Sequence, residues 1–130
     1  MVSDEADLLG AGDKTPKNSY VAVFVPSRTR SGYDIDHASW VQEAVEVLSQ
    51  LFGGATAVEG FGGWFDEECG QVLTERVSMV VSFISEEEWN RAKVRELRRF
   101  LHRMGRETEQ GEVGLLVQNC FYRIVRFDDE

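Results

Sequence analysis

The 130-residue chain is poor in cysteine and proline, with two of each. Cys69 and Cys120 are too few for a disulfide framework and lack metal-binding spacing, which favours a reducing compartment. No apolar run approaches the roughly 18 residues needed to cross a bilayer. No basic and then apolar N-terminal pattern indicates a secretory signal. We therefore expect a cytoplasmic protein without membrane spans.

The common catalytic signatures are also missing from the sequence. It has no Gly-x-x-x-x-Gly-Lys phosphate loop and no Gly-x-Ser-x-Gly nucleophile elbow. It also has no His-Glu-x-x-His helix and no Cys-x-x-Cys pair, the usual beginnings of a zinc site. The strands lack the basic-Gly-aromatic signature with which RNA-recognition motifs stack bases. We therefore expect neither a cofactor nor a metal site.

The residues that are abundant suffice for one hydrophobic core. Hydrophobic residues make up 42% of the chain, with 8 Phe and 3 Trp, and its length fits a single domain. The formal net charge of −9 favours solubility and argues against wholesale nucleic-acid binding. Residues 1–19 are polar and aperiodic, so we expect a disordered acidic tail there. A single domain over 20–127 and a short acidic tail over 128–130 would follow.

Hydrophobic periodicity predicts the order of elements within that domain. Apolar residues recur at helical spacing in two segments, and β-rich runs bounded by turn residues make up the rest. Ser85 with Glu88 forms a capping box for the second helix, and Gly105 is expected to stop it. The pattern predicts a strand at 20–26, a helix over about 36–52, a hairpin of strands at 55–65 and 71–85, a helix over about 85–104, and strands at 112–118 and 121–127.

This order, β-α-β-β-α-β with one extra strand, is that of the ferredoxin-like or split βαβ sandwich. We expect an α+β fold in which two helices cover one face of a four- or five-stranded, mostly antiparallel sheet. The strands are rich in apolar and aromatic residues, so the other face should not stay in water. By analogy with other proteins of this architecture, we expect a homodimer packed through that face.

The sequence also resembles a small family of bacterial proteins that have no established activity. The resemblance covers about residues 20–124 and rests on four segments. These are LFGGAT at 51–56, the Gly63-Trp64 pair, the Glu75-Arg76 pair, and FLHRMGRETEQGEV at 100–113. It implies a ferredoxin-like fold and implies nothing about mechanism.

Positive charge is concentrated in one segment, because half of the 14 Lys and Arg residues lie between Arg91 and Arg106. Six of these seven are arginines, which prefer bidentate contacts with carboxylate or phosphate. At about 100° per residue, one set of side chains falls opposite the helix's apolar stripe. This arginine face comprises Arg91, Arg95, Arg98, Arg99, His102 and Arg106.

We expect the arginine face to bind an acidic protein or nucleic acid. The alternative is a solvated surface balanced by the chain's many acidic residues. The leading interpretation is therefore a small binding or regulatory module that engages an acidic partner. Two others stay open: an enzyme that acts on a phosphodiester or nucleotide, and a structural subunit of a larger assembly.

For the enzyme interpretation, His102 is a candidate general base because neighbouring cations disfavour its charged form. Arg76, Arg99 and Arg106 would then hold a phosphate. A surface histidine without a catalytic role fits the same pattern.

A second group of candidates lies outside the arginine face. Glu75 and Arg76 could meet Glu107, Gln110 and Glu112 if the long strand and the strand after the second helix are neighbours. Trp64, with Phe61 and Phe65 in the same glycine-rich segment, could form a stacking platform or a pocket wall. The structural alternatives are a hydrogen-bonded turn for the polar residues and a core or interface position for the tryptophan.

Overall fold

A computed structural model describes residues 2–12 and 16–128 of the chain. Within these ranges it has three helices and five strands, which confirms the predicted α+β class. No described helix is long and apolar enough to cross a membrane. In chain order the elements are α1 (Val2–Leu9), β1 (Ser19–Pro26), α2 (His37–Phe52), β2 (Thr56–Asp66), β3 (Gln71–Ile84), α3 (Arg91–Glu107), β4 (Val113–Val117) and β5 (Cys120–Ile124).

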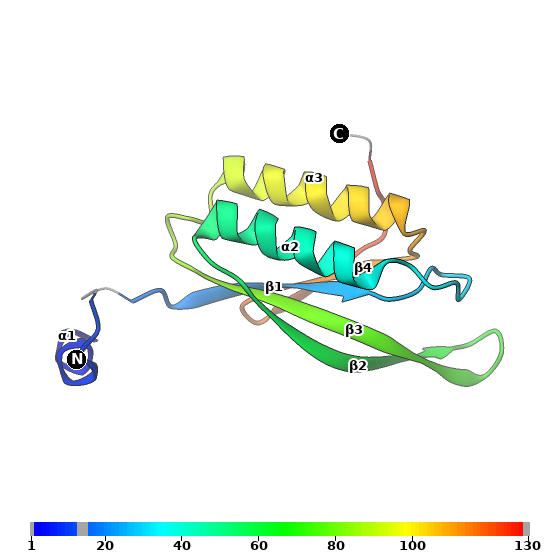
Figure 1. The fold of residues 1–130 in the computed structure, drawn as a ribbon, viewed down its shortest axis with the longest axis horizontal. Coiled ribbons are helices and arrows are strands. Elements are labelled where there is room, and N and C mark those ends of the chain that lie inside the picture. The colour runs from blue at the N-terminus through cyan, green and yellow to red at the C-terminus, as the bar shows by residue number, and fades with distance from the viewer. Residues whose placement is uncertain (1, 13–15, 129–130) are drawn as a thin grey trace.

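The strands form one sheet in the order β2-β3-β1-β4-β5, and every neighbouring pair is antiparallel. α2 and α3 lie together over one face of this sheet (Figure 1). We call the opposite face the open face. β1 is central, since it pairs with β3 on one side and β4 on the other.

The core lies between the sheet and the two helices. Val21, Val23 and Val25 alternate along β1 and are fully buried there. Each such side chain stabilises the fold by roughly 1.5–3 kcal/mol relative to an exposed position. Because side chains alternate along a strand, Phe24 points to the open face.

β2 and β3 are longer than β1, and their hairpin projects past the helices (Figure 1). The pairing of β1 with β3 ends at Pro26 and Val77, whereas β2 and β3 stay paired as far as Asp66 and Gln71. We call residues 61–76, which lie beyond this end of β1, the hairpin arm. The arm is two strands wide, so many of its apolar side chains stay exposed.

The predicted start of the second helix is wrong by about six residues. The capping-box hydrogen bonds form, from Ser85 N–H to Glu88 (2.9 Å) and from Glu88 N–H to Ser85 (3.2 Å). They close a turn, and α3 begins only at Arg91. Its N-cap is Asn90, whose side chain accepts a hydrogen bond from the N–H of Lys93 at 3.0 Å.

The predicted stop at Gly105 is also wrong. Gly105 is buried within α3, where an added Cβ would overlap the Phe127 ring. The helix instead ends after Glu107, and Glu109 takes the left-handed conformation with φ of 52°. The N–H of Gln110 then donates to the carbonyl of Gly105 at 2.9 Å. Gly105 therefore serves close packing rather than helix termination.

The segment expected to be a disordered tail carries α1, which stands apart from the two layers (Figure 1). Leu8 and Leu9 at its end are 87% and 82% exposed. Residues 1, 13–15 and 129–130, which belong to the two expected tails, lie outside the described residues. The expected domain boundaries therefore stay predictions.

We expect Gly105→Ala to lower the free energy of unfolding by about 1–3 kcal/mol, because the methyl group would force the Phe127 ring off the helix. Urea unfolding of the variant and the wild-type protein measures this change. Gly54→Ala is the matched control, since a Cβ there meets no atom within 4 Å. Equal loss in the two variants would show that the Phe127 contact is not the cause.

The ion pair between Lys17 and Glu88 predicts a pH dependence of stability. The hydrogen bond from Ser85 N–H lowers the pKa of Glu88 from its usual 4.5, and Lys17 lowers it further. Because the pKa of Glu88 is lower in the folded protein than in the unfolded chain, its charged form stabilises the fold above pH 4.5. This stabilisation is lost as the pH falls through the lowered pKa. Glu88→Gln should therefore destabilise the protein at pH 7, and the difference from wild type should shrink towards pH 3. Urea unfolding at both values tests this, and a difference that grows in acid would contradict it.

Candidate functional site

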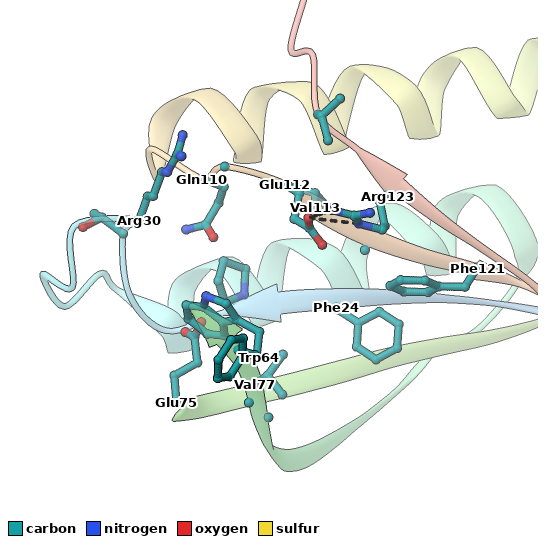
Figure 2. A pocket seen from close by; sticks show the side chains of 18 of the residues that line it. Phe24, Arg30, Trp64, Glu75, Val77, Gln110, Glu112, Val113, Phe121 and Arg123 are labelled. Carbon is teal, nitrogen blue, oxygen red and sulfur yellow. Dashed lines mark hydrogen bonds and ion pairs between the residues drawn. The ribbon is translucent and has the colours of Figure 1, made fainter. Parts of the chain in front are cut away.

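A cleft of about 990 Å³ lies on the open face, where β1 ends and the hairpin arm begins (Figure 2). Its floor is apolar and comes from β1, β3, β4 and β5. Its rim carries charged and amide side chains from the loop after β1, from β3, from the turn after α3 and from β5. The principal residues are Phe24, Val77, Gly114 and Phe121 in the floor, Trp64 in the arm, and Arg30, Glu75, Gln110, Glu112 and Arg123 at the rim.

The floor depends on a glycine. The rings of Phe24 and Phe121 meet edge to face, with centroids 5.9 Å apart and planes at 83°. A Cβ on Gly114 would lie 3.0 Å from Phe121 and 3.2 Å from Phe24. The missing side chain thus lets the two rings come together, and Phe121 stays 55% exposed to the cleft. The result is an accessible aromatic surface.

Glu75 is a fixed carboxylate in the wall of the cleft. One oxygen, Oε1, accepts hydrogen bonds from Ser27 N–H at 2.9 Å and from Arg28 N–H at 3.1 Å. The Ser27 hydroxyl lies 3.1 Å from it and 2.6 Å from the Arg76 carbonyl, and its single proton is shared between these two acceptors. Oε2 has no hydrogen-bond partner among the described residues, so it is available to a ligand. A carboxylate held this way can bind a cation or accept a hydrogen bond without reorganising.

The loop after β1 and the turn after α3 are joined at one end of the cleft. The N–H of Arg30 donates to the carbonyl of Glu109 at 3.0 Å. The amide of Gln110 donates to the carbonyl of Arg28 at 2.7 Å. The left-handed conformation of Glu109 turns the chain so that these contacts form. Arg30 and Gln110 therefore reach the same rim from separate elements (Figure 2).

The other side of the rim holds an ion pair between neighbouring strands. Arg123 donates from Nε and Nη2 to one oxygen of Glu112, at 3.1 Å and 2.9 Å. This contact raises the pKa of the Arg123 guanidinium above its usual value, so the side chain stays charged. The rim thus presents carboxylates and guanidinium groups within one cleft.

Six of the residues singled out in the sequence line this cleft together: Phe61, Trp64, Phe65, Glu75, Gln110 and Glu112. The long strand β3 and the strand β4 are not neighbours, because β1 lies between them. Glu75 and Gln110 share the cleft nonetheless, since β1 ends at Pro26 and leaves the space open. Arg76 and Glu107 do not line it.

The residues of the arginine face lie elsewhere, on α3. Arg98 forms an ion pair with Asp128, Arg99 with Glu96, and Arg106 donates to a main-chain carbonyl, so much of the face contacts the chain itself. Arg91 and Arg95 are exposed.

His102 does not lie on an open surface as expected, because it is only 7% exposed. Its Nδ1 accepts a hydrogen bond from the N–H of Asp128 at 2.9 Å, and the Phe127 ring covers it. A nitrogen that accepts an N–H carries no proton itself, so the ring is held in one tautomer. This location separates His102 from the cleft.

Sequence reasoning missed several rim and floor residues. Arg30 lies in an arginine-containing loop after the first strand, a position that often carries function, so the sequence points to this loop without singling out the residue. Glu112 was a candidate from the sequence, but its partner Arg123 was not, because the two meet only through the register of β4 with β5. Phe24 and Phe121 meet only because residue 114 is glycine, which no local pattern reveals. Among the described residues, no cluster of three or more His, Cys, Asp or Glu could hold a metal ion.

No protein-family model matches the chain, and no curated protein matches its sequence. Two solved structures of a phage SAM lyase are similar in fold. The complex with S-methyl-5'-thioadenosine has a TM-score of 0.63 at 14% identity, over 86% of this chain and 92% of that chain. The apo form has a TM-score of 0.58 at 17% identity, over 87% and 93%. These identities show similarity of fold alone.

A Bacillus cereus protein related to NIF3 is more distant. Its TM-score is 0.47 at 18% identity, and the match covers 95% of this chain but 33% of that chain.

Proposed function

We propose that the cleft binds an adenosine-type ligand with a positively charged sulfur, of the class of S-adenosylmethionine. The observation that carries this proposal is the combination of exposed aromatic side chains with the fixed carboxylate of Glu75 in one cleft. Support comes from the fold, which is similar to a phage SAM lyase whose structure holds S-methyl-5'-thioadenosine. The proposal also agrees with the nucleotide-acting alternative drawn from the sequence.

The aromatic side chains suit the nucleoside part of such a ligand. Trp64 and Phe121 are 48% and 55% exposed, so their ring faces are accessible without rearrangement of the core. Stacking of one base on one aromatic ring contributes about 1–3 kcal/mol as measured by alanine substitution. A sulfonium also gains from an aromatic face through cation–π attraction.

The charged side chains suit the rest of the ligand. Oε2 of Glu75 offers negative charge to the sulfonium, while Oε1 is held by Ser27 and Arg28. The guanidinium of Arg30, at the same rim, can pair with the carboxylate of an attached amino acid. The cleft therefore matches both signs of charge that S-adenosylmethionine carries.

A lyase reaction at this site would break the bond between sulfur and Cγ of the amino-acid chain. The sulfur would take the bonding electron pair and leave as neutral S-methyl-5'-thioadenosine. The ligand's own carboxylate oxygen would bond to Cγ and close a lactone, which balances atoms and charge. Since the positive charge on sulfur disappears along this path, a carboxylate beside it stabilises the bound ligand more than the transition state. We therefore assign Glu75 to binding rather than to the chemical step.

Glu75→Gln should lower the affinity for S-adenosylmethionine about tenfold and leave that for neutral S-methyl-5'-thioadenosine unchanged. The glutamine oxygen can keep the hydrogen bonds of Ser27, so the fold should persist. Isothermal titration of both ligands measures the effect. Glu59→Gln is the matched control, because Glu59 is exposed on β2 outside the cleft. Absence of binding of either ligand to the wild-type protein would refute the proposal.

The arginine-face function drawn from the sequence, a module that engages an acidic partner, stays a second proposal. The geometry favours the cleft for a small ligand, because Arg98, Arg99 and Arg106 already make contacts within the chain. The role of a structural subunit and a cytoplasmic location likewise stay predictions.

We also propose that the fold is a ferredoxin-like sandwich with one extra strand. A ferredoxin-like sandwich has the βαββαβ order with its first strand at the sheet centre, beside the third and last strands. The order β2-β3-β1-β4, with α2 and α3 on one face, supports this assignment, and β5 would be the extra edge strand.

A homodimer through the open face stays a prediction, supported by apolar side chains such as Val58 and Phe83, which are 50% and 63% exposed there. Phe83→Glu should convert such a dimer to a monomer, since it would bury an unpaired charge. Light scattering measures the mass, with Glu59→Gln as the control. A wild-type protein that is monomeric at high concentration would contradict the prediction.

A further inference from the structure

The segment of residues 125–128 runs from the end of β5 to α3 and lies beside the C-terminal end of that helix (Figure 1). Three α3 side chains, spaced four residues apart, hold its last described residue. Arg98 pairs with the carboxylate of Asp128. Nδ1 of His102 accepts the main-chain N–H of Asp128 at 2.9 Å, and Arg106 donates to the main-chain carbonyl. The N–H, the C=O and the carboxylate of Asp128 are therefore each recognised by a different side chain.

The preceding residue is held by shape. The Phe127 ring lies directly against Gly105, where even a Cβ would overlap it. The same ring meets the His102 imidazole edge to face, with centroids 6.1 Å apart and planes at 84°. The ring fits there only because Gly105 has no side chain. His102 thus contacts both residues, the ring of Phe127 and the main chain of Asp128.

The connection to the rest of the fold is slight by comparison. Val125 is 58% exposed and Arg126 is exposed, and neither belongs to a strand. The contacts of Phe127 and Asp128 therefore hold the segment on the helix. A pocket for one aromatic side chain, side-chain partners for the main chain and arginine for a carboxylate are the elements of peptide recognition.

We propose that α3 carries a binding groove for an extended peptide with phenylalanine followed by aspartate, and that the chain's own Phe127 and Asp128 fill it. The groove is made of Arg98, His102, Gly105 and Arg106. It accepts the same motif from another chain when its own segment leaves. The acidic partner expected for the arginine face is then a peptide in which an aromatic residue precedes the acidic one.

Occupation by the chain's own segment blocks the groove. A short tether gives an effective concentration on the order of millimolar, so a separate peptide at micromolar concentration cannot displace the tethered copy of the same motif. The groove becomes available only when the segment is altered or drawn away. The groove shares no side chain with the proposed ligand contacts of the cleft, so this inference does not depend on the proposed function.

The test uses the full chain with Phe127→Ala and Asp128→Ala, which removes the ring from its slot and the carboxylate from Arg98 and leaves only the main-chain contacts of residue 128 with His102 and Arg106. We call this variant the emptied protein. The probe is a fluorescent peptide with the sequence of residues 122–128, and fluorescence anisotropy measures its binding. We expect the double variant to bind the peptide at least about tenfold more tightly than the wild-type protein does. Circular dichroism establishes that the variant is folded. If it is not, Asp128→Lys alone takes its place, since it removes the contact with Arg98 and so weakens the hold of the segment on the groove.

Arg98→Glu added to the emptied protein should lower peptide affinity about tenfold or more, because it replaces attraction for the peptide's aspartate with repulsion. Arg95→Glu is the matched control, since it makes the same charge change one turn away on an exposed side chain that contacts no part of the segment. A peptide with lysine in place of aspartate should not bind. No binding to the emptied protein, or equal loss from the two glutamate substitutions, would overturn the proposal.

Discussion

The position of β1 at the centre of the sheet is the constraint on which the rest of the structure depends. Its valines, Val21, Val23 and Val25, anchor both helices, while Phe24 faces the other way and forms part of the cleft floor. Because β1 stops at Pro26 while its neighbour β3 belongs to a longer hairpin, the sheet is open at that point. The cleft and the core are thus consequences of one buried strand and of where it ends.

Much of the fold could be predicted from periodicity, because burial of one face imposes a repeat on the sequence. The stripe of α2, its end at Gly53 and the β2–β3 hairpin follow such local rules. Gly105 shows their limit. A glycine near the end of an apolar stripe resembles a helix stop, but here its role is set by the ring of Phe127, which is distant in sequence. Contacts of that kind leave no periodic signal.

The candidate site was only partly predictable for the same reason. The sequence indicated Trp64, Glu75 and Gln110 through their residue types and their neighbours in the chain, and all three line the cleft. The pair of Glu112 with Arg123 depends on strand register, and His102 lies under a segment that was expected to be the end of the last strand and the start of the acidic tail. Charge counting identified the arginines of α3, but it could not show that their first partner would be the chain itself.

The hairpin arm has a further consequence for how the cleft behaves. A ribbon of two strands without a packed layer behind it is marginally stable, so it opens locally at a much smaller free energy than the core strands do. Amide hydrogen exchange in residues 61–76 should therefore be far faster than in β1. One wall of the cleft is built on this ribbon through Trp64, which lies farther out along the arm than the anchored Glu75. Part of any ligand's binding energy would then be spent on ordering that wall, and its slowed exchange would report occupancy directly.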